Sequence, residues 1–299
     1  MLREQLQKRL EQRLKQYVSH NRSMLDDSEA IEMKKESCAR RGAEIVRAKA
    51  EGKITDEKKG NASSEVYYSV HLKYLIKQKN AFFLEEGIEH RKAEFYKGIL
   101  VGDEEIALFG LEQDPDSGIG EIEGDSEERA QKAKQIMYRY DRLKAVQYAE
   151  RWWNDYNPAY KKFDVDCTNY ISQCLHAGGA PMRGYPQRAN GWWMMNSNWS
   201  FSWTVANSMR WYLPSSKNGL RAKEVASASQ LKLGDVICYD FQGDGRFDHT
   251  TIVTAKDANG MPLVNAHTHN SRNRYWAYED STAYTPRIKY KFLSIVDDQ

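Results

Sequence analysis

The sequence lacks the features that direct a protein into or across a membrane. No run of about 18 consecutive apolar residues occurs, so no segment is expected to span a bilayer. Residues 1–13 carry charges at almost every second position and contain no apolar stretch of the kind found in signal peptides. We therefore expect a cytoplasmic protein without a membrane partner, and an extracytoplasmic one only if a leader is missing from this sequence.

An excess of charge of one sign and paired cysteines are also missing. The 44 Lys and Arg residues nearly balance 42 Asp and Glu residues, so the net charge of +2 gives no reason to expect a nucleic-acid partner. The cysteines are scattered and have no CxxC spacing, which argues against a zinc site and a disulfide framework. They are Cys38, Cys167, Cys174 and Cys238. We expect free thiols and no metal.

The N-terminal region has a helical pattern. Apolar residues recur every four positions from Leu2 to Val18, and Ile31, Cys38 and Ile45 follow heptad spacing. Up to about Glu51 this predicts a helical hairpin that covers a sheet or a partner helix, with Gly52 and Gly60 ending the helical region. A protein partner that binds through these helices is an alternative use of the same pattern.

Alternating residues follow between 63 and 109 and predict strands. Val66, Tyr68, Val70 and Leu72 alternate with polar residues, which is typical of a half-exposed antiparallel sheet. Residues 112–128 are rich in Gly, Asp and Pro and read as a loop. We place a domain boundary there, with a spacer or binding domain at 1–125 and a second domain at 126–299. A helix from about 128 to 154 is expected to enter the second domain.

The clearest chemical signal is a cysteine at the start of a predicted helix. Asp164 lies at the start of the segment 164–175, and Gly178 and Gly179 follow its end. An Asp before a helix and Gly after it are typical of helix ends. Cys167 would lie in the first turn, where backbone amides and the helix dipole favour a thiolate and lower the thiol pKa. A small buried residue is the simpler interpretation of Cys167 alone.

Two later strands carry polar residues that could complete such a site. His249 begins a strand that follows a Gly243–Gly245 hairpin turn. On the next strand, alternation predicts that Asn265, His267 and His269 share one face. A catalytic base needs an acceptor that fixes its far ring nitrogen, so this strand could offer His249 a partner.

These segments together resemble a known family. The run Asp166–Tyr170, then Leu233–Val236, His249, and finally Val264–Ala266 looks like the NlpC-type branch of the papain-related fold. The stretch from Tyr140 to about Trp276 is more closely similar to the "putative amidase domain" of Gram-positive bacteria. The similarity covers roughly half of the chain.

The resemblance implies a fold class and roles for individual residues. It implies an α+β chain whose C-terminal papain-like domain packs a cysteine-bearing helix on an antiparallel sheet, after an N-terminal helical and antiparallel-sheet domain. It implies Cys167 as nucleophile, His249 as base and Asn265 as the orienting residue. His267 competes with Asn265, because many relatives have a histidine in this role. The usual substrates of such domains are cell-wall peptides.

Other residues are candidates for substrate binding. Trp192, Trp193 and Trp203 lie in a loop-rich segment and could form an aromatic platform for a glycan or peptide, or could equally supply a core. Asp166 could approach the oxyanion site, although capping of the helix is its commoner role. Asp240, Asp244 and Asp248 miss the calcium-loop spacing and predict a turn.

The sequence thus predicts a cysteine-nucleophile amide hydrolase that acts on peptide or muropeptide bonds through a Cys-His-Asn triad, without a metal or an organic cofactor. Acyl transfer on the same thiol and a non-catalytic module with the same fold are the alternatives. Retention of Cys167, His249 and Asn265 together argues against a decayed site.

Overall fold

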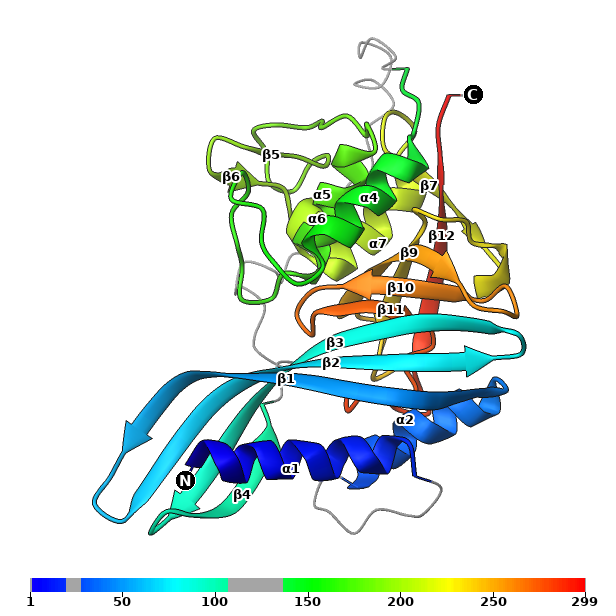
Figure 1. Ribbon diagram of the computed structural model, residues 1–299. Coiled ribbons are helices and arrows are strands. Elements are labelled where there is room, and N and C mark those ends of the chain that lie inside the picture. The colour runs from blue at the N-terminus through cyan, green and yellow to red at the C-terminus, as the bar shows by residue number, and fades with distance from the viewer. Residues whose placement is uncertain (1, 20–27, 107–136, 299) are drawn as a thin grey trace. The chain divides into compact units, whose positions relative to one another are not determined.

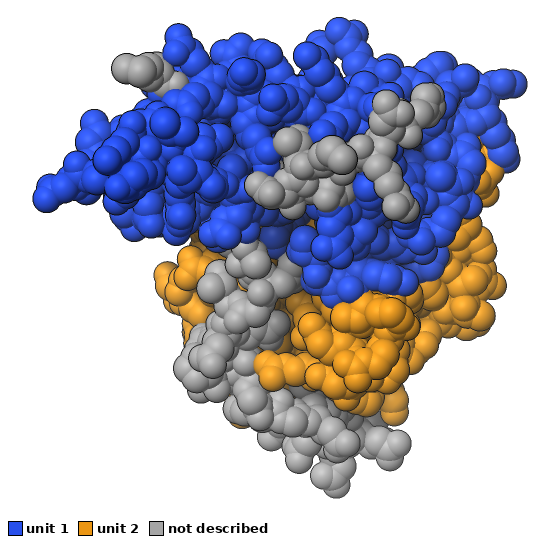
Figure 2. Space-filling model, turned by 90° about the horizontal axis from the view of Figure 1, so that it is seen from below, with its two compact units in different colours: residues 1–109, 269–284 blue, residues 110–268, 285–299 orange. Residues whose placement is uncertain are grey.

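The computed structural model describes residues 2–19, 28–106 and 137–298. The chain forms two compact units, which Figure 2 colours separately. The first unit comprises residues 1–109 and 269–284, and the second comprises residues 110–268 and 285–299. Residues 269–284, which the sequence analysis assigned to the C-terminal domain, therefore pack with the N-terminal region. The predicted boundary near residue 125 lies outside the described residues.

The first unit is an antiparallel sheet covered by two helices (Figure 1). Helices α1 (Leu2–Tyr17) and α2 (Ser28–Arg40) precede strands β1 (Ala43–Lys59), β2 (Ser63–Gln78), β3 (Ala81–Tyr96) and β4 (Ile99–Glu105). β2 lies between β1 and β3, and β3 also pairs with β4 and with β11 (Ser271–Tyr275). The predicted strands are confirmed.

The core of the first unit lies between the two helices and the apolar face of β2, on which the even-numbered residues from Val66 to Ile76 lie. Leu6 and Leu10 of α1 and Ile31 of α2 pack there with alternating β2 side chains such as Val66 and Val70. The apolar stripe of the helices therefore covers their own sheet, as the simpler interpretation of the pattern predicted. A protein partner for these helices stays a prediction.

The prediction of a helix up to Glu51 was wrong beyond residue 42. Residues 43–59 form β1, which pairs with β2 along almost its whole length. Their Lys, Glu and Ala content favours a helix, but the long ladder to β2 overrides this weak local preference. Gly52 does not end a helix; it lies within β1, where an added Cβ would come within 3.2 Å of Leu10.

The second unit packs helices against antiparallel strands. Neighbouring strands run in the order β10 (Pro262–Ala266), β9 (His249–Lys256), β8 (Val236–Asp240), β12 (Lys289–Val296) and β7 (Arg221–Val225). The helices are α4 (Arg142–Trp152), α5 (Cys167–Ala177), α6 (Phe201–Thr204) and α7 (Ala206–Ser215). A short hairpin joins β5 (Met194–Met195) to β6 (Asn198–Trp199).

The α+β class and the cysteine helix on an antiparallel sheet agree with expectation. Ile171 and Cys174 of α5 share one core with Val236 and Cys238 of β8 and with Ile252 of β9. Of the helix expected over residues 128–154, α4 forms residues 142–152, and residues 128–136 lie outside the described part; the Asp141 side chain accepts a hydrogen bond from the Lys144 amide and caps α4. Within the described part of the chain, no helix has both the length and the apolar character needed to cross a membrane.

Candidate active site

Cys167 is the first residue of α5, as the sequence predicted. Residue 166 is the N-cap, and the helix ends at Gly178, followed by Gly179 with a positive φ of 94°. The Cys167 side chain is 2% exposed. The thiol therefore lies at the end of a helix where backbone N–H groups lack helical partners, but it is covered by protein.

The first turn of α5 is tied to the start of β9 by two threonine hydroxyls. Thr168 Oγ1 and Thr250 Oγ1 are 3.1 Å apart, and the Cys167 Sγ lies 3.7 Å from Thr168 Oγ1. Burial raises the pKa of the Cys167 thiol, while hydrogen bonds from Thr168 and Thr250 act in the opposite direction. The predicted lowering of this pKa was wrong for this structure, because loss of solvent outweighs the polar contacts at the helix start.

His249 is the first residue of β9 and is 1% exposed. It lies opposite Tyr239 of β8, and its ring centroid is 5.7 Å from that of Tyr239 and 6.1 Å from that of Phe241. Consecutive strand residues alternate in direction, so Thr250 faces α5 while His249 shares the face of Tyr239. The Thr168–Thr250 hydrogen bond thus joins the residues that follow Cys167 and His249, while alternation places the His249 side chain on the other face of β9 from Thr250.

Asn265 lies on β10, opposite Ile252 of β9. Its Oδ1 accepts a hydrogen bond from Thr254 at 2.9 Å, and its Nδ2 donates to Glu150 of α4 at 2.9 Å. These contacts connect β10 to its neighbouring strand and to α4. The predicted orienting role of Asn265 toward His249 stays a prediction.

His267 has a different environment from the one that the sequence suggested. β10 ends at Ala266, so strand alternation does not continue to His269, which belongs to the first unit. His267 Nδ1 is 2.8 Å from Asp166 Oδ2, and its Nε2 is 2.7 Å from the Trp152 carbonyl oxygen. The ring also stacks on Tyr170, with centroids 3.9 Å apart. Both ring nitrogens thus face acceptors within the protein.

Asp166 is the N-cap residue of α5, and its side chain supports the start of this helix through contacts other than a cap hydrogen bond. Its Oδ1 accepts from the Phe163 amide at 3.0 Å and from Asn169 Nδ2 at 2.9 Å, and its Oδ2 faces His267. No hydrogen bond joins the carboxylate to the backbone of the first turn, so Asp166 has the predicted cap position without the side-chain cap bond. The carboxylate instead holds a loop, a helix side chain and the residue after β10, and it is 1% exposed.

The three tryptophans considered for substrate binding are core residues. Trp192, Trp193 and Trp203 are each 0% exposed. Trp192 Nε1 donates to Ser172 Oγ at 3.0 Å, and Trp203 Nε1 donates to Asn169 Oδ1 at 2.9 Å. Trp192 and Trp203 therefore bind side chains of α5, Trp193 donates to the Asn190 carbonyl oxygen, and these three buried rings do not form an aromatic platform. Segment 192–203 lacks aliphatic residues, and these rings fill its interior.

Two further residues of the site, Thr168 and Thr250, were not predicted from the sequence. Thr168 and Thr250 lie directly beside Cys167 and His249, but a threonine is common in both helices and strands, so only their contact across the fold shows their role. Within residues 2–19, 28–106 and 137–298, no group of three or more His, Cys, Asp or Glu side chains could hold a metal ion.

Comparison with known proteins identifies the family. The family model described as "Putative amidase domain" matches residues 139–293, which include Cys167, His249 and Asn265. The chain belongs to this amidase-domain family. The Bacillus subtilis (strain 168) "Uncharacterized protein YhbB" is 51% identical over 286 residues, which cover 94% of this chain and 91% of that protein.

A second B. subtilis (strain 168) relative, "Uncharacterized protein YjcM", is 34% identical over 143 residues, or 45% of this chain and 32% of that protein. No solved structure matches the chain. Membership of the amidase-domain family indicates amide hydrolysis as the class of reaction.

Proposed function

We propose that the second unit is a cysteine-nucleophile amide hydrolase in which Cys167 attacks and His249 is the general base. The observation that carries this proposal is the Thr168–Thr250 hydrogen bond. It holds the first turn of α5 against the first residues of β9, and the nucleophile and the base are the neighbours of these two threonines. Strand β9 begins at His249, so this residue lies at the end of its strand.

The chemistry follows from these positions. His249 takes the proton of the Cys167 thiol, and the thiolate attacks the amide carbonyl carbon. The backbone N–H at the start of α5 donates to the oxygen that becomes negative. His249 then gives its proton to the leaving amine, and water hydrolyses the thioester to release the acid and the free thiol. This sequence requires no metal or organic cofactor.

Asn265 and His267 receive separate roles in this proposal. Both ring nitrogens of His267 are engaged, by Asp166 and by the Trp152 carbonyl, so His267 acts as a positioning residue for the start of α5. Asn265 is kept as the candidate that orients His249 on the basis of the family resemblance; its side chain lies on the β9 face of Ile252 and Thr254 and bonds Thr254 and Glu150. Its bond to Glu150 fixes the direction of its amide group.

Peptide or cell-wall amide bonds are the proposed substrates, on the basis of the family. Transfer of the acyl group to an amine in place of water would use the same thiol and the same base. One observation favours a non-catalytic module instead: the Cys167 thiol is buried and its pKa is raised by that burial. Reactivity of the thiol separates the catalytic proposals from this module.

The test is alkylation of the native protein with iodoacetamide between pH 5 and 9, with each site quantified by mass spectrometry. We expect Cys167 to react at least about tenfold faster than the buried Cys174 and Cys238 below pH 7, because a thiolate paired with an imidazolium reacts while neutral thiols do not. His249→Ala should remove this advantage.

The matched control is His176→Ala, a second histidine of the same unit that bonds the Ala180 carbonyl near the end of α5. It should leave Cys167 reactivity unchanged. If Cys167 in the wild type reacts as slowly as Cys174, the catalytic proposal fails and the binding module takes its place. If the rate of Cys167 is high but indifferent to His249, the nucleophile stands and the assignment of the base is wrong.

A further inference from the structure

The first unit contains a polar cavity that the proposed hydrolase chemistry does not use. Its volume is about 110 Å³, and all of its lining residues come from residues 1–109 and 269–284. Helices α1 and α2 contribute Tyr17 and Lys34, strand β3 contributes residues 85–89, and Glu105 and Ser271 come from β4 and β11. A space of this size accepts a ligand of roughly five non-hydrogen atoms.

Gly87 provides the room for this cavity. It lies on β3, opposite Leu72 of β2 and Ser271 of β11. A Cβ added there would meet no atom closer than the Asn270 carbonyl oxygen at 3.9 Å. The absence of a side chain at one position of a long strand thus leaves a gap between the carboxylates of Glu85 and Glu89, which alternation places on the same face.

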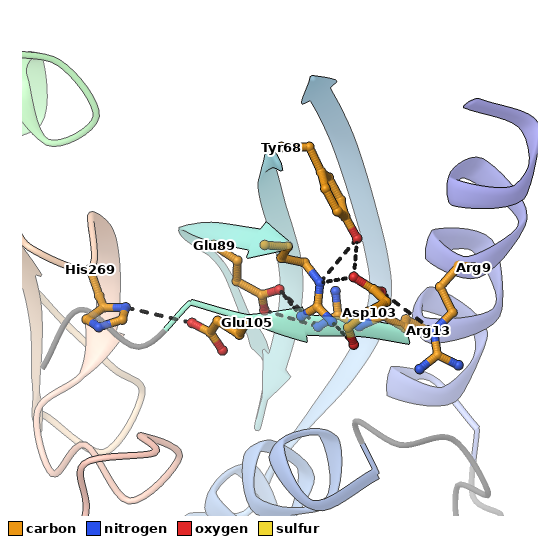
Figure 3. Close-up of polar contacts among 8 residues, drawn as sticks. Arg9, Arg13, Tyr68, Glu89, Asp103, Glu105 and His269 are labelled. Carbon is orange, nitrogen blue, oxygen red and sulfur yellow. Dashed lines mark hydrogen bonds and ion pairs between the residues drawn. The ribbon is translucent and has the colours of Figure 1, made fainter. Parts of the chain in front are cut away.

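Most of the charges around the cavity are paired. At one end, Asp280 accepts from Lys34 at 2.8 Å and from Arg274 at 3.0 Å, and Lys34 also bonds Glu85. At the other end, Arg13 Nη2 lies 3.0 Å from a Glu89 oxygen (Figure 3). In these pairs the positive and negative charges balance, so they do not require a charged ligand.

Glu105 differs from these carboxylates. The side chain closest to its Oε1 in Figure 3 is that of His269, whose Nδ1 lies 3.7 Å away. Burial, together with the nearby charges of Arg274 and His90, lowers the pKa of His269 to about 3, so this ring is neutral near pH 7. Burial and the Glu89 charge raise the pKa of Glu105 to about 7. A cation in the cavity would relieve this cost.

Ser271 provides a second, independent feature. Its side chain lines the cavity and the residue is 4% exposed, yet its Oγ has no hydrogen-bond partner among the described residues. A buried hydroxyl without a partner costs free energy unless a ligand or a water satisfies it. The hydroxyl and the Glu105 carboxylate are both acceptors, so they fit a ligand with N–H donors.

We propose that this cavity binds a small alkylammonium ligand, whose protonated amine donates to the Glu105 carboxylate and the Ser271 hydroxyl. The alkyl part would contact Leu72 and the Tyr74 ring, which line the same space. An organic ammonium fits better than a metal ion, because no metal-binding group of three or more His, Cys, Asp or Glu side chains exists in the described parts of the chain. A primary ammonium has three N–H donors and needs no such group.

The test is calorimetric titration of the full chain at pH 8 with n-butylammonium chloride. 1-Butanol has the same number of non-hydrogen atoms without the charge, and butyrate carries the opposite charge. Saturable binding of n-butylammonium, with at least about tenfold weaker binding of the alcohol, is the expected result, because a charge-assisted hydrogen bond in a partly desolvated site is stronger than a neutral one.

Three variants locate the binding. Glu105→Gln should weaken it at least about tenfold, and Ser271→Ala about threefold, since one loses the charge and the other an acceptor. Gly87→Val fills the cavity with a residue that suits a strand and should abolish binding. Glu104→Gln, on the neighbouring exposed position of β4, should change nothing.

Affinity should also rise as pH increases from 6 to 8, because Glu105 loses its proton near pH 7 in the free protein. The other charged groups that act on the Glu105 carboxylate are Glu89, Arg91, Arg13 and Arg274. The His269 ring beside it is neutral in this pH range. Equal binding of the alcohol and the ammonium, or unchanged affinity in a folded Glu105→Gln protein, overturns the proposal. So does a calorimetric response to KCl equal to that to n-butylammonium, which would indicate a simple cation site.

Discussion

The two units bury charged groups in different ways. Among the described residues, the buried Lys and Arg side chains all belong to the first unit: Arg13, Lys34 and Arg91. There, buried carboxylates pair with cations that lie far away along the chain, as in Lys34 with Asp280. In the second unit, buried carboxylates accept backbone N–H groups of nearby turns, although Asp235 also pairs with Arg142.

Asp240 illustrates the second arrangement. Its side chain is 0% exposed and accepts from the amides of Gly243, Asp244 and Gly245 in the turn that leads to β9. A local turn supplies hydrogen-bond donors to such a carboxylate as soon as the turn forms. The ion pairs of the first unit form only when the whole unit has folded. The first unit should therefore be the more sensitive to loss of one charge.

The largest expected effect is for Asp280→Asn. Burial alone would raise the pKa of Asp280, but Arg274 and Lys34 lower it below its ordinary value, which shows how strongly the two cations depend on this carboxylate. Removing the Asp280 charge leaves the buried Lys34 and the largely covered Arg274 without a common carboxylate, which should cost about 3–5 kcal/mol of the free energy of unfolding. Urea unfolding with peptide-resolved hydrogen exchange measures the loss in the first unit separately.

Glu279→Gln is the matched control, because Glu279 pairs with Arg40, whose side chain is 54% exposed. An exposed pair of this kind is worth about 0–1 kcal/mol. Similar losses for Asp280→Asn and Glu279→Gln would contradict the distinction between paired buried charges and surface charges.

A smaller effect is expected for Asp240→Asn in the second unit. The amide oxygen can still accept from Gly243 and Asp244, but the new NH2 group faces the Gly245 amide, which also donates. We expect a loss of about 1–3 kcal/mol, since one buried hydrogen bond is lost and the turn is otherwise retained. Asp244→Asn, which alters a carboxylate at an exposed position of the same turn, should stay within about 0.5 kcal/mol in the same assay.

The smallest effect concerns the pH dependence of the first unit. The folded pKa of Glu105, about 7, lies above its ordinary value of 4.5, so the unfolded chain releases this proton at lower pH than the folded one. Its contribution to stability is therefore present below pH 4.5 and is lost as pH rises toward 7. Glu105→Gln should remove about 1–2 kcal/mol of this decline between pH 5 and 8, measured by urea unfolding. A pH profile identical to that of Glu104→Gln would be inconsistent with this shift.

The same contrast explains which parts of the molecule could be predicted. The cysteine helix, the Gly243–Gly245 turn and the strand that begins at His249 have local signals, namely helix-end residues, turn glycines and alternation. The structure confirms each of these elements. β1 could not be predicted, because its residues favour a helix and only pairing with β2 selects the strand.

The candidate site divides in the same way. The positions of Cys167 and His249 at the starts of their elements follow from motifs. The burial of Trp192 and Trp203 and the engagement of His267 by Asp166 do not, because both depend on what lies across the fold. A tryptophan suits a core and a binding surface equally well until its neighbours are known.

By itself, the sequence determined the α+β class, the cysteine at a helix start and the order of the polar motifs that place the chain in its family. These depend on periodicity and on residues within a few positions of one another. Tertiary structure alone decided that residues 269–284 join the first unit, that the Cys167 thiol is buried with a raised pKa, and that Glu105 and Ser271 face a common cavity. Burial and charge pairing depend on segments that meet only after folding, and no local pattern records them.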